Sequence, residues 1–169
     1  LKIEKNIPCE DASNCTKIIQ LQPSFSMVLK EFNKSAYGEI YSLAYIMWKD
    51  HILFGIGLNN FTFLCNNDPR YKNLMQNYDC VTHPHNIYLQ WLVETGVFGL
   101  ILFIIYLFIL FKIITRNGYS QFAVLSLANM LILFWPIMST GSLLKNWMGV
   151  STFFIIGVCL SISQIKQKI

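Results

Sequence analysis

The stretch from His83 to Gly99 reads HPHNIYLQWLVETGVFG, and it decides how the rest of the chain is arranged. His83 and His85 flank a proline just before an apolar helical pattern begins. Glu94 is the one carboxylate in that pattern, and a Gly-x-x-Gly pair then leads into a long uncharged segment. This order places titratable side chains where a membrane helix meets water.

Three apolar segments downstream have the composition of membrane helices, and we expect spans at about 93–114, 122–138 and 150–165. Basic residues follow the first segment and the third one, and the positive-inside rule assigns both positions to the cytoplasm. The resulting topology exports residues 1–92 together with the short loop 139–149. Residues 166–169 are then a cytoplasmic tail.

The composition of the whole chain agrees with a membrane protein. Of its 169 residues, 54% are hydrophobic and 13% are charged, whereas soluble domains average about 25% charged residues. The formal net charge of +4 arises from basic residues at helix ends, so it indicates membrane topology rather than nucleic-acid binding. The chain begins at Leu1 without an initiator Met or a signal peptide, and we therefore expect it to be the C-terminal part of a longer protein.

Residues 1–92 are more polar, and we expect an extracytoplasmic loop with interfacial helices. The clearest helical pattern runs from Tyr37 to Trp48, where apolar residues recur at helical spacing. Its aromatic side chains suit a helix lying on the membrane surface. A core helix of the exported loop fits the same pattern.

Four of the five cysteines lie in this polar half, namely Cys9, Cys15, Cys65 and Cys80. An even number in an exported loop predicts disulfides, most simply Cys9–Cys15 and Cys65–Cys80, although the sequence allows three pairings. The alternative is four free thiols in a reducing compartment.

His83 and His85 admit three interpretations. A histidine near a helix start can bond the backbone, it can bind a metal ion, or it can act as a general base or substrate ligand near neutral pH. No cysteine or carboxylate stands nearby at ligand spacing, so the sequence does not favour zinc.

Glu94 is costly near a membrane boundary unless it is paired, faces a wet cavity or reaches the interface. It lies about two and a half helical turns after His85, which predicts that the two share one side. Arg70, Lys72 and Lys145 are among the outward cations that can hold an anionic lipid head group, although most such cations are simply solvated. Lys49 is another.

The segment 49–61 contains Gly55 and Gly57, which release the backbone for a tight turn or a close approach. It lacks the preceding strand and the third glycine of a dinucleotide-binding site, so we reject that interpretation.

These residues together carry a family resemblance. His85-Asn86, nine intervening residues and the glycine pair in 96–99 resemble the His-[Asn/Ser/Gln]-x9-Gly-x-x-Gly signature of the bacterial O-antigen ligase family, part of a superfamily that includes O-antigen polymerases. Segment 49–61 is similar to the family's second motif, which usually reads close to Asp-His-Pro-Leu-Phe-Gly-Val-Gly. Residues 134–136 and the polar turn 139–142 are similar to the next family segment. The resemblance covers the chain from about Tyr37 onward.

The resemblance implies an all-α integral membrane protein, the C-terminal part of a multispanning GT-C-type glycosyltransferase with a large periplasmic loop in the bacterial inner membrane. Such enzymes move a glycan from undecaprenyl diphosphate to a sugar hydroxyl, usually on lipid A–core oligosaccharide, and need no metal or other cofactor. The implied partners are the lipid-linked glycan, the lipid A–core acceptor and membrane lipid, with no nucleic acid. His85 would be the base and Arg70 a phosphate clamp. The further substrate-binding residues would be His83, Asn86, Glu94, Gly55 and Gly57.

The sequence departs from the family in one respect that concerns activity. An arginine normally stands about a dozen residues before the Lys-Asp-His segment, and residues 34–39 contain none. Ile52 also replaces the usual proline. Either Lys34 or Arg70 substitutes for the arginine, or the activity is altered or lost.

Three other functions stay open from the sequence: a repeat-unit polymerase, a ligase that attaches glycans to protein, and a non-enzymatic membrane protein such as a transporter fragment or scaffold. The predicted spans hold almost no charge that could serve as an ion relay, which speaks against transport.

Overall fold

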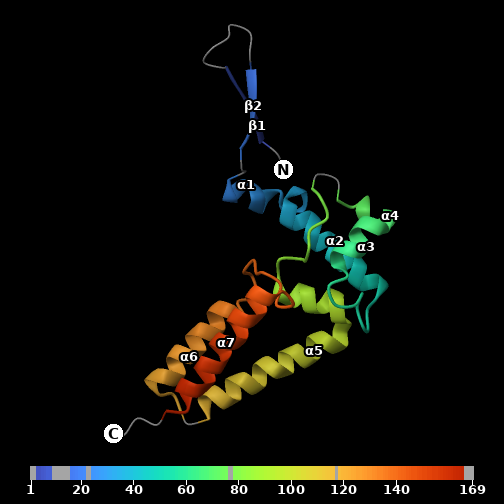
Figure 1. Ribbon diagram of the computed structural model, residues 1–169. Coiled ribbons are helices and arrows are strands. Elements are labelled where there is room, and N and C mark those ends of the chain that lie inside the picture. Colours follow the sequence, from blue (N-terminus) through green and yellow to red (C-terminus); the bar gives the residue numbers. More distant parts are fainter. Residues whose placement is uncertain (1–2, 9–15, 22–23, 76–77, 117, 166–169) are drawn as a thin grey trace.

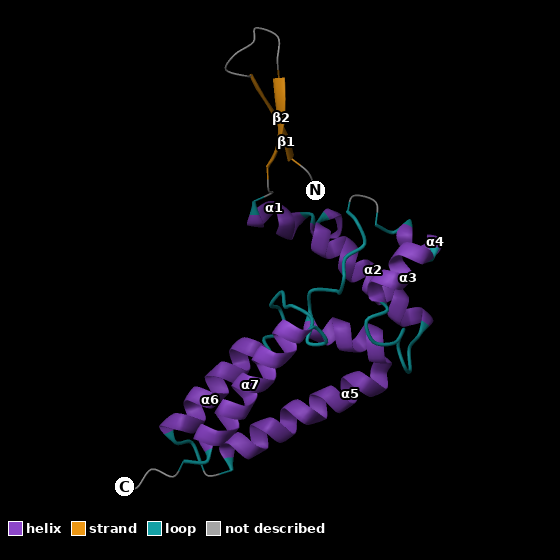
Figure 2. Ribbon diagram, viewed as in Figure 1, coloured by secondary structure: helices purple, strands orange, loops and turns teal. Residues whose placement is uncertain are grey.

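The computed structural model describes residues 3–8, 16–21, 24–75, 78–116 and 118–165. In these ranges the chain is helical apart from one β-hairpin at its N-terminal end (Figures 1 and 2). The elements are β1 (Ile3–Pro8), β2 (Thr16–Leu21), α1 (Phe25–Lys30), the 3-10 helix η1 (Phe32–Lys34), α2 (Ala36–Asp50), α3 (Phe61–Asn67), α4 (Pro69–Lys72), α5 (Ile87–Thr115), α6 (Gln121–Leu133) and α7 (Asn146–Ser163).

The hairpin departs from the all-α fold that we expected. Its strands pair antiparallel, from Ile3 opposite Leu21 to Pro8 opposite Thr16. Each strand holds only six residues, too few for their periodicity to separate a strand from a helix, although isoleucine and threonine favour strands. The hairpin projects away from the helices (Figure 1).

Helix α2 forms the core of the N-terminal half of the chain. Ser35 caps it, because its hydroxyl accepts a hydrogen bond from the N–H of Gly38 at 3.1 Å. The apolar stripe of α2 is buried and shares one cluster with α3, α4 and α5. The cluster consists of Ile40, Leu43, Ala44, Met47, Ile56, Phe61, Cys65, Tyr71 and Val93. Of the two interpretations of this segment, the structure supports a core helix.

Helix α5 is two helical parts joined at Gly96. Gly96 has φ 69° and ψ −168°, a conformation outside the helical region. A positive φ suits glycine, because it has no Cβ to collide with the backbone. The shorter first part lies next to α2, and the long second part runs toward α6 and α7 (Figures 1 and 2).

Two helices in the described part of the chain, α5 and α7, are long and apolar enough to cross a membrane. Only 17% of the most apolar window of α5 and 28% of that of α7 is buried, whereas a core helix of a soluble protein is mostly buried. Large apolar side chains on both helices are exposed, such as Phe108 and Phe154. Their exposure suits contact with lipid.

Helix α6 has 13 residues and ends at Leu133, whereas we expected a span from 122 to 138. Proline disfavours the helical conformation of the residue before it, and its own N–H is missing. Pro136 therefore explains the early end. By itself α6 is shorter than the roughly 20 residues that cross a bilayer.

Candidate active site

The two glycine motifs of the sequence meet at the kink of α5. In an unbroken helix the carbonyls of Val93 and Glu94 would accept hydrogen bonds from residues four positions on. Gly96 interrupts that pattern. The N–H groups of Ile56 and Gly57 replace the missing donors, and each bond is 2.9 Å long.

The exchange is reciprocal, because the first N–H groups after the kink also need partners. The N–H of Val97 donates to the carbonyl of Ile52 at 2.9 Å, and the N–H of Phe98 donates to that of Leu53 at 3.4 Å. The loop after α2 is therefore hydrogen-bonded into the broken turn of α5 on both sides of the kink.

This close packing explains the glycines. A Cβ at Gly55 would collide with the backbone of Glu94, and one at Gly96 would collide with the backbone of Leu53. Both glycines also have a φ of 69°. We expected Gly55 and Gly57 to bind substrate; the structure places them in this backbone junction, where they fix the position of the site.

Residues 82–86, the histidine loop, precede α5 and are held by the loop between α6 and α7. His83 is buried, its Nδ1 lies 2.9 Å from the Thr82 hydroxyl, and its Nε2 lies 3.2 Å from the carbonyl of Thr140. Both ring nitrogens are thus used inside the protein, which favours a role for His83 in fixing the loop.

His85 is held differently. Its backbone adopts φ 55°, and its carbonyl accepts a hydrogen bond from the N–H of Thr140 at 2.8 Å. The ring is half-buried, with centroids 4.3 Å from His83 and 6.2 Å from Tyr37. Among the described residues, no side chain or backbone group bonds either ring nitrogen of His85. The imidazole is therefore positioned by an edge-on contact with Tyr37, a tilted contact with His83 and its backbone, while its nitrogens make no hydrogen bond in the described residues.

Asn86 joins the start of α5 to the end of α6. Its Oδ1 accepts from the N–H of Leu89 at 3.0 Å and caps the helix, while its Nδ2 donates to the carbonyl of Pro136 at 2.7 Å. Tyr88 donates its hydroxyl to the carbonyl of Phe134 at 2.7 Å. These carbonyls follow the last turn of α6, so they need donors from outside that helix.

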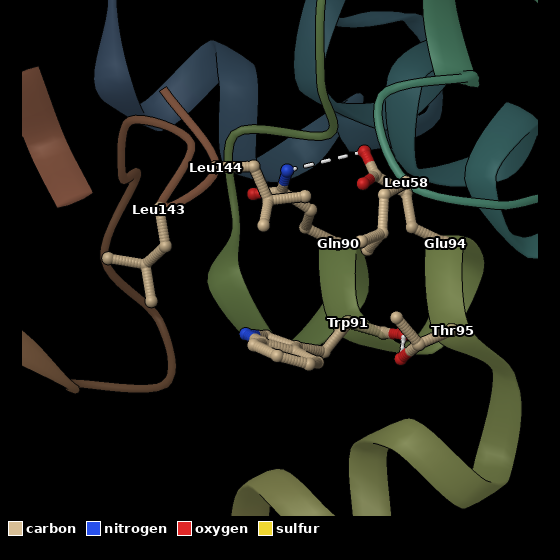
Figure 3. A pocket seen from close by; sticks show the side chains of 7 residues that line it. All are labelled: Leu58, Gln90, Trp91, Glu94, Thr95, Leu143 and Leu144. Atoms are coloured by element: carbon tan, nitrogen blue, oxygen red, sulfur yellow. Dashed lines mark hydrogen bonds between the residues drawn. The ribbon is translucent and has the colours of Figure 1, made fainter. Parts of the chain in front are cut away.

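The side chain of Glu94 is 1% exposed, and both of its carboxylate oxygens accept hydrogen bonds from uncharged groups. Its Oε2 accepts the N–H of Asn59 at 3.0 Å, and its Oε1 accepts the amide of Gln90 at 3.2 Å (Figure 3). The same Gln90 amide donates to the hydroxyl of Ser142 at 2.7 Å. We expected Glu94 to share a side with His85; it faces the loop that carries Asn59, and no hydrogen bond links it to His85 in the described residues.

A small cavity of about 10 Å³ lies beside this chain of hydrogen bonds. Figure 3 shows Gln90, Trp91, Glu94 and Thr95 of α5 on one side and Leu143 and Leu144 on the other. Its volume is close to that of one water molecule, so it is too small for a sugar.

A larger, open cavity of about 480 Å³ is lined in part by Thr82. It is formed where the loop after α2, the histidine loop and the start of α7 converge. Its lining residues are Asn59, Thr62, Thr82, Leu144, Lys145 and Asn146. No carboxylate is among them.

The surroundings of His83 favour the neutral form of its ring. Burial lowers the pKa of His83 below its ordinary value of 6.5, and the nearby charges of His85 and Lys145 lower it further, against the hydrogen bond to Thr140. Lys145 is thus close enough to influence the histidine loop electrostatically.

Arg70 lies elsewhere. Its guanidinium pairs with Asp68 at 2.7 Å and with Asp50 at 3.8 Å, and Asp50 ends α2. His85 packs on Tyr37, at the beginning of α2. These two ends are roughly 20 Å apart at the rise of an α-helix, so the structure does not bring Arg70 to His85.

A disulfide joins Cys65 of α3 to Cys80, with a Cα–Cα distance of 5.8 Å. The Thr62 hydroxyl adds a bond of 2.8 Å to the carbonyl of Val81. Both links hold the segment that leads into the histidine loop. This pairing confirms one of the two expected disulfides; Cys9 and Cys15 lie outside the described residues.

The residues that the sequence did not assign to the site are Tyr37, Gln90, Thr140 and Ser142. Residues 139–142 were noticed only as a polar turn similar to a family segment, and nothing in that turn predicted that it would reach the histidines. In the described ranges no group of three or more His, Cys, Asp or Glu side chains is arranged to hold a metal ion.

Fold and site define a helical membrane protein whose polar loops converge at the start of its longest apolar helix. A family profile described as O-antigen ligase matches residues 15–104, more than half of the chain. The chain belongs to the O-antigen ligase family, whose members are enzymes of the glycosyltransferase and ligase type. The matched region contains both glycine motifs and the histidine loop. No curated protein and no solved structure matches the chain.

Proposed function

We propose that this protein transfers a glycan from undecaprenyl diphosphate to a sugar hydroxyl of lipid A–core at the periplasmic face of the inner membrane. The observation that carries the proposal is the state of His85. Its ring is held by Tyr37 and His83, while its nitrogens make no hydrogen bond in the described residues. A fixed imidazole with a free lone pair is suited to general-base catalysis.

In the proposed reaction the acceptor hydroxyl attacks the anomeric carbon of the lipid-linked glycan. The new glycosidic C–O bond forms as the bond between that carbon and the diphosphate oxygen breaks. The hydroxyl proton passes to His85, and the electron pair of the broken bond leaves with undecaprenyl diphosphate. The site must therefore lie where a lipid carrier and a water-exposed sugar can meet, which is the outer boundary of the bilayer.

The surrounding residues have positioning roles in this proposal. His83 and Asn86 fix the loop on either side of His85, and the glycine junction fixes α5 beneath it. Glu94 holds the loop after α2 in place twice, because its carbonyl accepts the N–H of Gly57 and its carboxylate accepts the N–H of Asn59. We assign Arg70 no part in binding the diphosphate, because its guanidinium is paired at the far end of α2.

The membrane topology belongs to the same proposal. Residues 1–92 are placed in the periplasm, followed by three membrane segments near 93–114, 122–138 and 150–165 and a cytoplasmic tail at 166–169. The Cys65–Cys80 disulfide supports this orientation, since disulfides form in the periplasm and are rare in the cytosol.

The test is a His85→Ala substitution, with a His85→Gln variant that keeps a polar side chain but has no titratable lone pair. Membranes are assayed for glycan transfer, and the products are separated by gel and by mass spectrometry. Both variants should lose transfer by roughly 100- to 10,000-fold, the usual contribution of a general base. Lys72→Gln on α4 is the surface control, and this variant should keep glycan transfer.

Unchanged transfer by either His85 variant would remove this residue from the mechanism. The product identifies the acceptor: label on lipid A–core supports the ligase, whereas label on a lengthening polysaccharide or on protein assigns the same chemistry to a polymerase or a protein ligase.

A further inference from the structure

We propose that the open cavity at the start of α7 is an anion site, and that Lys145 in it binds the diphosphate of the glycan donor. This inference rests on the proposed function, because it assigns the leaving group of that reaction to a second set of residues beside the histidine loop. The cavity has about 480 Å³, and five of its six lining residues are polar.

The chemistry of the lining favours an anion. Lys145 is exposed and makes no ion pair in the described residues, and no carboxylate lines the cavity. The amides of Asn59 and Asn146 can donate hydrogen bonds, as can the hydroxyl of Thr82. A cation with several neutral donors and no acidic neighbour suits the oxygens of a diphosphate.

The walls of the cavity are held in place by the buried hydrogen bonds described above. Glu94 fixes the backbone of Asn59, and Gln90 links Glu94 to the hydroxyl of Ser142. That hydroxyl in turn accepts the N–H of Leu144 at 3.2 Å, and the carbonyl of Ser142 accepts the N–H of Lys145 at 3.2 Å. The two sides of the cavity are therefore joined through the interior rather than through flexible surface contacts.

The position relative to His85 fits a displacement reaction. Thr82 lines the cavity, its hydroxyl bonds His83, and the ring of His83 packs on that of His85. His83 therefore contacts both a residue of the cavity lining and the base. In a displacement at carbon the attacking oxygen and the leaving oxygen are on opposite sides of that carbon, so the base and the phosphate site should be neighbours without touching.

Lys145 would act on the bond that breaks. As the anomeric carbon separates from the diphosphate oxygen, negative charge grows on that oxygen, and the ammonium group stabilises it without giving up its proton. The acceptor proton still goes to His85. Lys145 thus supplies a cation in place of the arginine that is missing from residues 34–39 and that Arg70 is too distant to replace.

The first experiment measures binding without turnover. Membranes containing the protein are treated with the amine reagent sulfo-N-hydroxysuccinimide acetate, and modification of Lys145 and Lys72 is followed by mass spectrometry. Inorganic pyrophosphate should slow the modification of Lys145 severalfold and leave Lys72 unchanged, whereas potassium chloride of equal ionic strength should protect neither. A neutral disaccharide should also fail to protect Lys145. Equal modification of Lys145 with and without pyrophosphate would overturn the anion site.

The second experiment measures transfer by Lys145→Gln and Lys145→Arg. The glutamine variant should lose on the order of 100-fold in transfer rate, and the arginine variant should recover most of it because the charge is kept. Full activity of Lys145→Gln together with loss of activity in His85→Ala would refute the role of Lys145 and leave the proposed function standing. Protection of Lys145 by pyrophosphate together with full activity of His85→Ala would instead refute the base and leave the anion site standing.

Discussion

The side-chain amide of Gln90 donates to the hydroxyl of Ser142 at 2.7 Å, and this buried bond links α5 to the loop between α6 and α7. The same amide donates to Glu94, so one side chain connects the kinked helix, the loop after α2 and the wall of the Lys145 cavity. The relationship means that distant segments of the chain share one buried polar cluster at the start of α5.

Replacing Gln90 with leucine should therefore destabilise the protein. Glu94 would lose a donor and Ser142 would lose another, and a buried polar group left without its partner costs about 1–3 kcal/mol. Thermal unfolding of the detergent-solubilised protein should show a lower Tm. Lys72→Leu, on the exposed surface of α4, is the control. Equal Tm values for the two variants would contradict the proposed coupling.

Gly96→Ala should destabilise the protein more than an ordinary helix substitution. The added Cβ meets the backbone of Leu53, and a backbone with φ 69° and ψ −168° alone costs a non-glycine residue about 1–3 kcal/mol. Gly157→Ala on α7 is a matched control, because no atom lies within 4 Å of its added Cβ. Alanine there should be neutral or stabilising. The Tm and the expressed amount of both variants are measured. A Gly96→Ala protein as stable as Gly157→Ala would contradict the close backbone packing at Gly96.

Replacing Cys65 and Cys80 by alanine should lower the free energy of unfolding by about 3 kcal/mol, the usual effect of a disulfide that closes a loop of this length. The loss should appear as increased proteolysis of the segment between α4 and α5. Cys159→Ser removes a free cysteine and should leave the cleavage pattern of that segment unchanged. Proteolysis that is equally slow in the alanine variant would show that the disulfide does not restrain the loop.

The lowered pKa of His83 predicts a pH effect on stability. The unfolded chain binds a proton on this residue near pH 6.5, while the folded protein binds it only at lower pH. Stability from neutral His83 is therefore full above about pH 6.5 and falls as the pH drops below that value, until the folded pKa is reached. His83→Gln should flatten the dependence of Tm on pH in this window. An unchanged slope would mean that other groups cause it.

Arg70→Gln should have little effect on transfer. Its guanidinium is exposed and pairs with Asp68 and Asp50, at the end of α2 opposite His85. The side chain is therefore far from the proposed reaction. Exposed ion pairs also contribute little to stability. The same membrane assay as for Lys145→Gln measures the effect. A large loss of transfer in Arg70→Gln would restore Arg70 as the phosphate clamp that the sequence suggested.

The membrane character and the family could be predicted from the sequence, because hydrophobic runs and local motifs are properties of neighbouring residues. The spacing from His85 to Gly96 and the glycines near Gly55 identified the right segments. It could not be predicted from that spacing that Gly55 packs against the backbone of Glu94 and Gly96 against that of Leu53, since a motif does not report its partner. The two-stranded hairpin was missed because its runs are too short to show a clear period.

What the sequence by itself determined is that the C-terminal half forms apolar helices and that a histidine stands just before the longest of them, because these depend on composition and short-range order. What only the tertiary structure decided is which polar groups meet at that place. Long-range contacts joined Thr140 to the histidines and Ser142 to Gln90, and they placed Arg70 at the far end of α2. Those pairings follow from the kink at Gly96 and the packing of three separate loops, which no local pattern encodes.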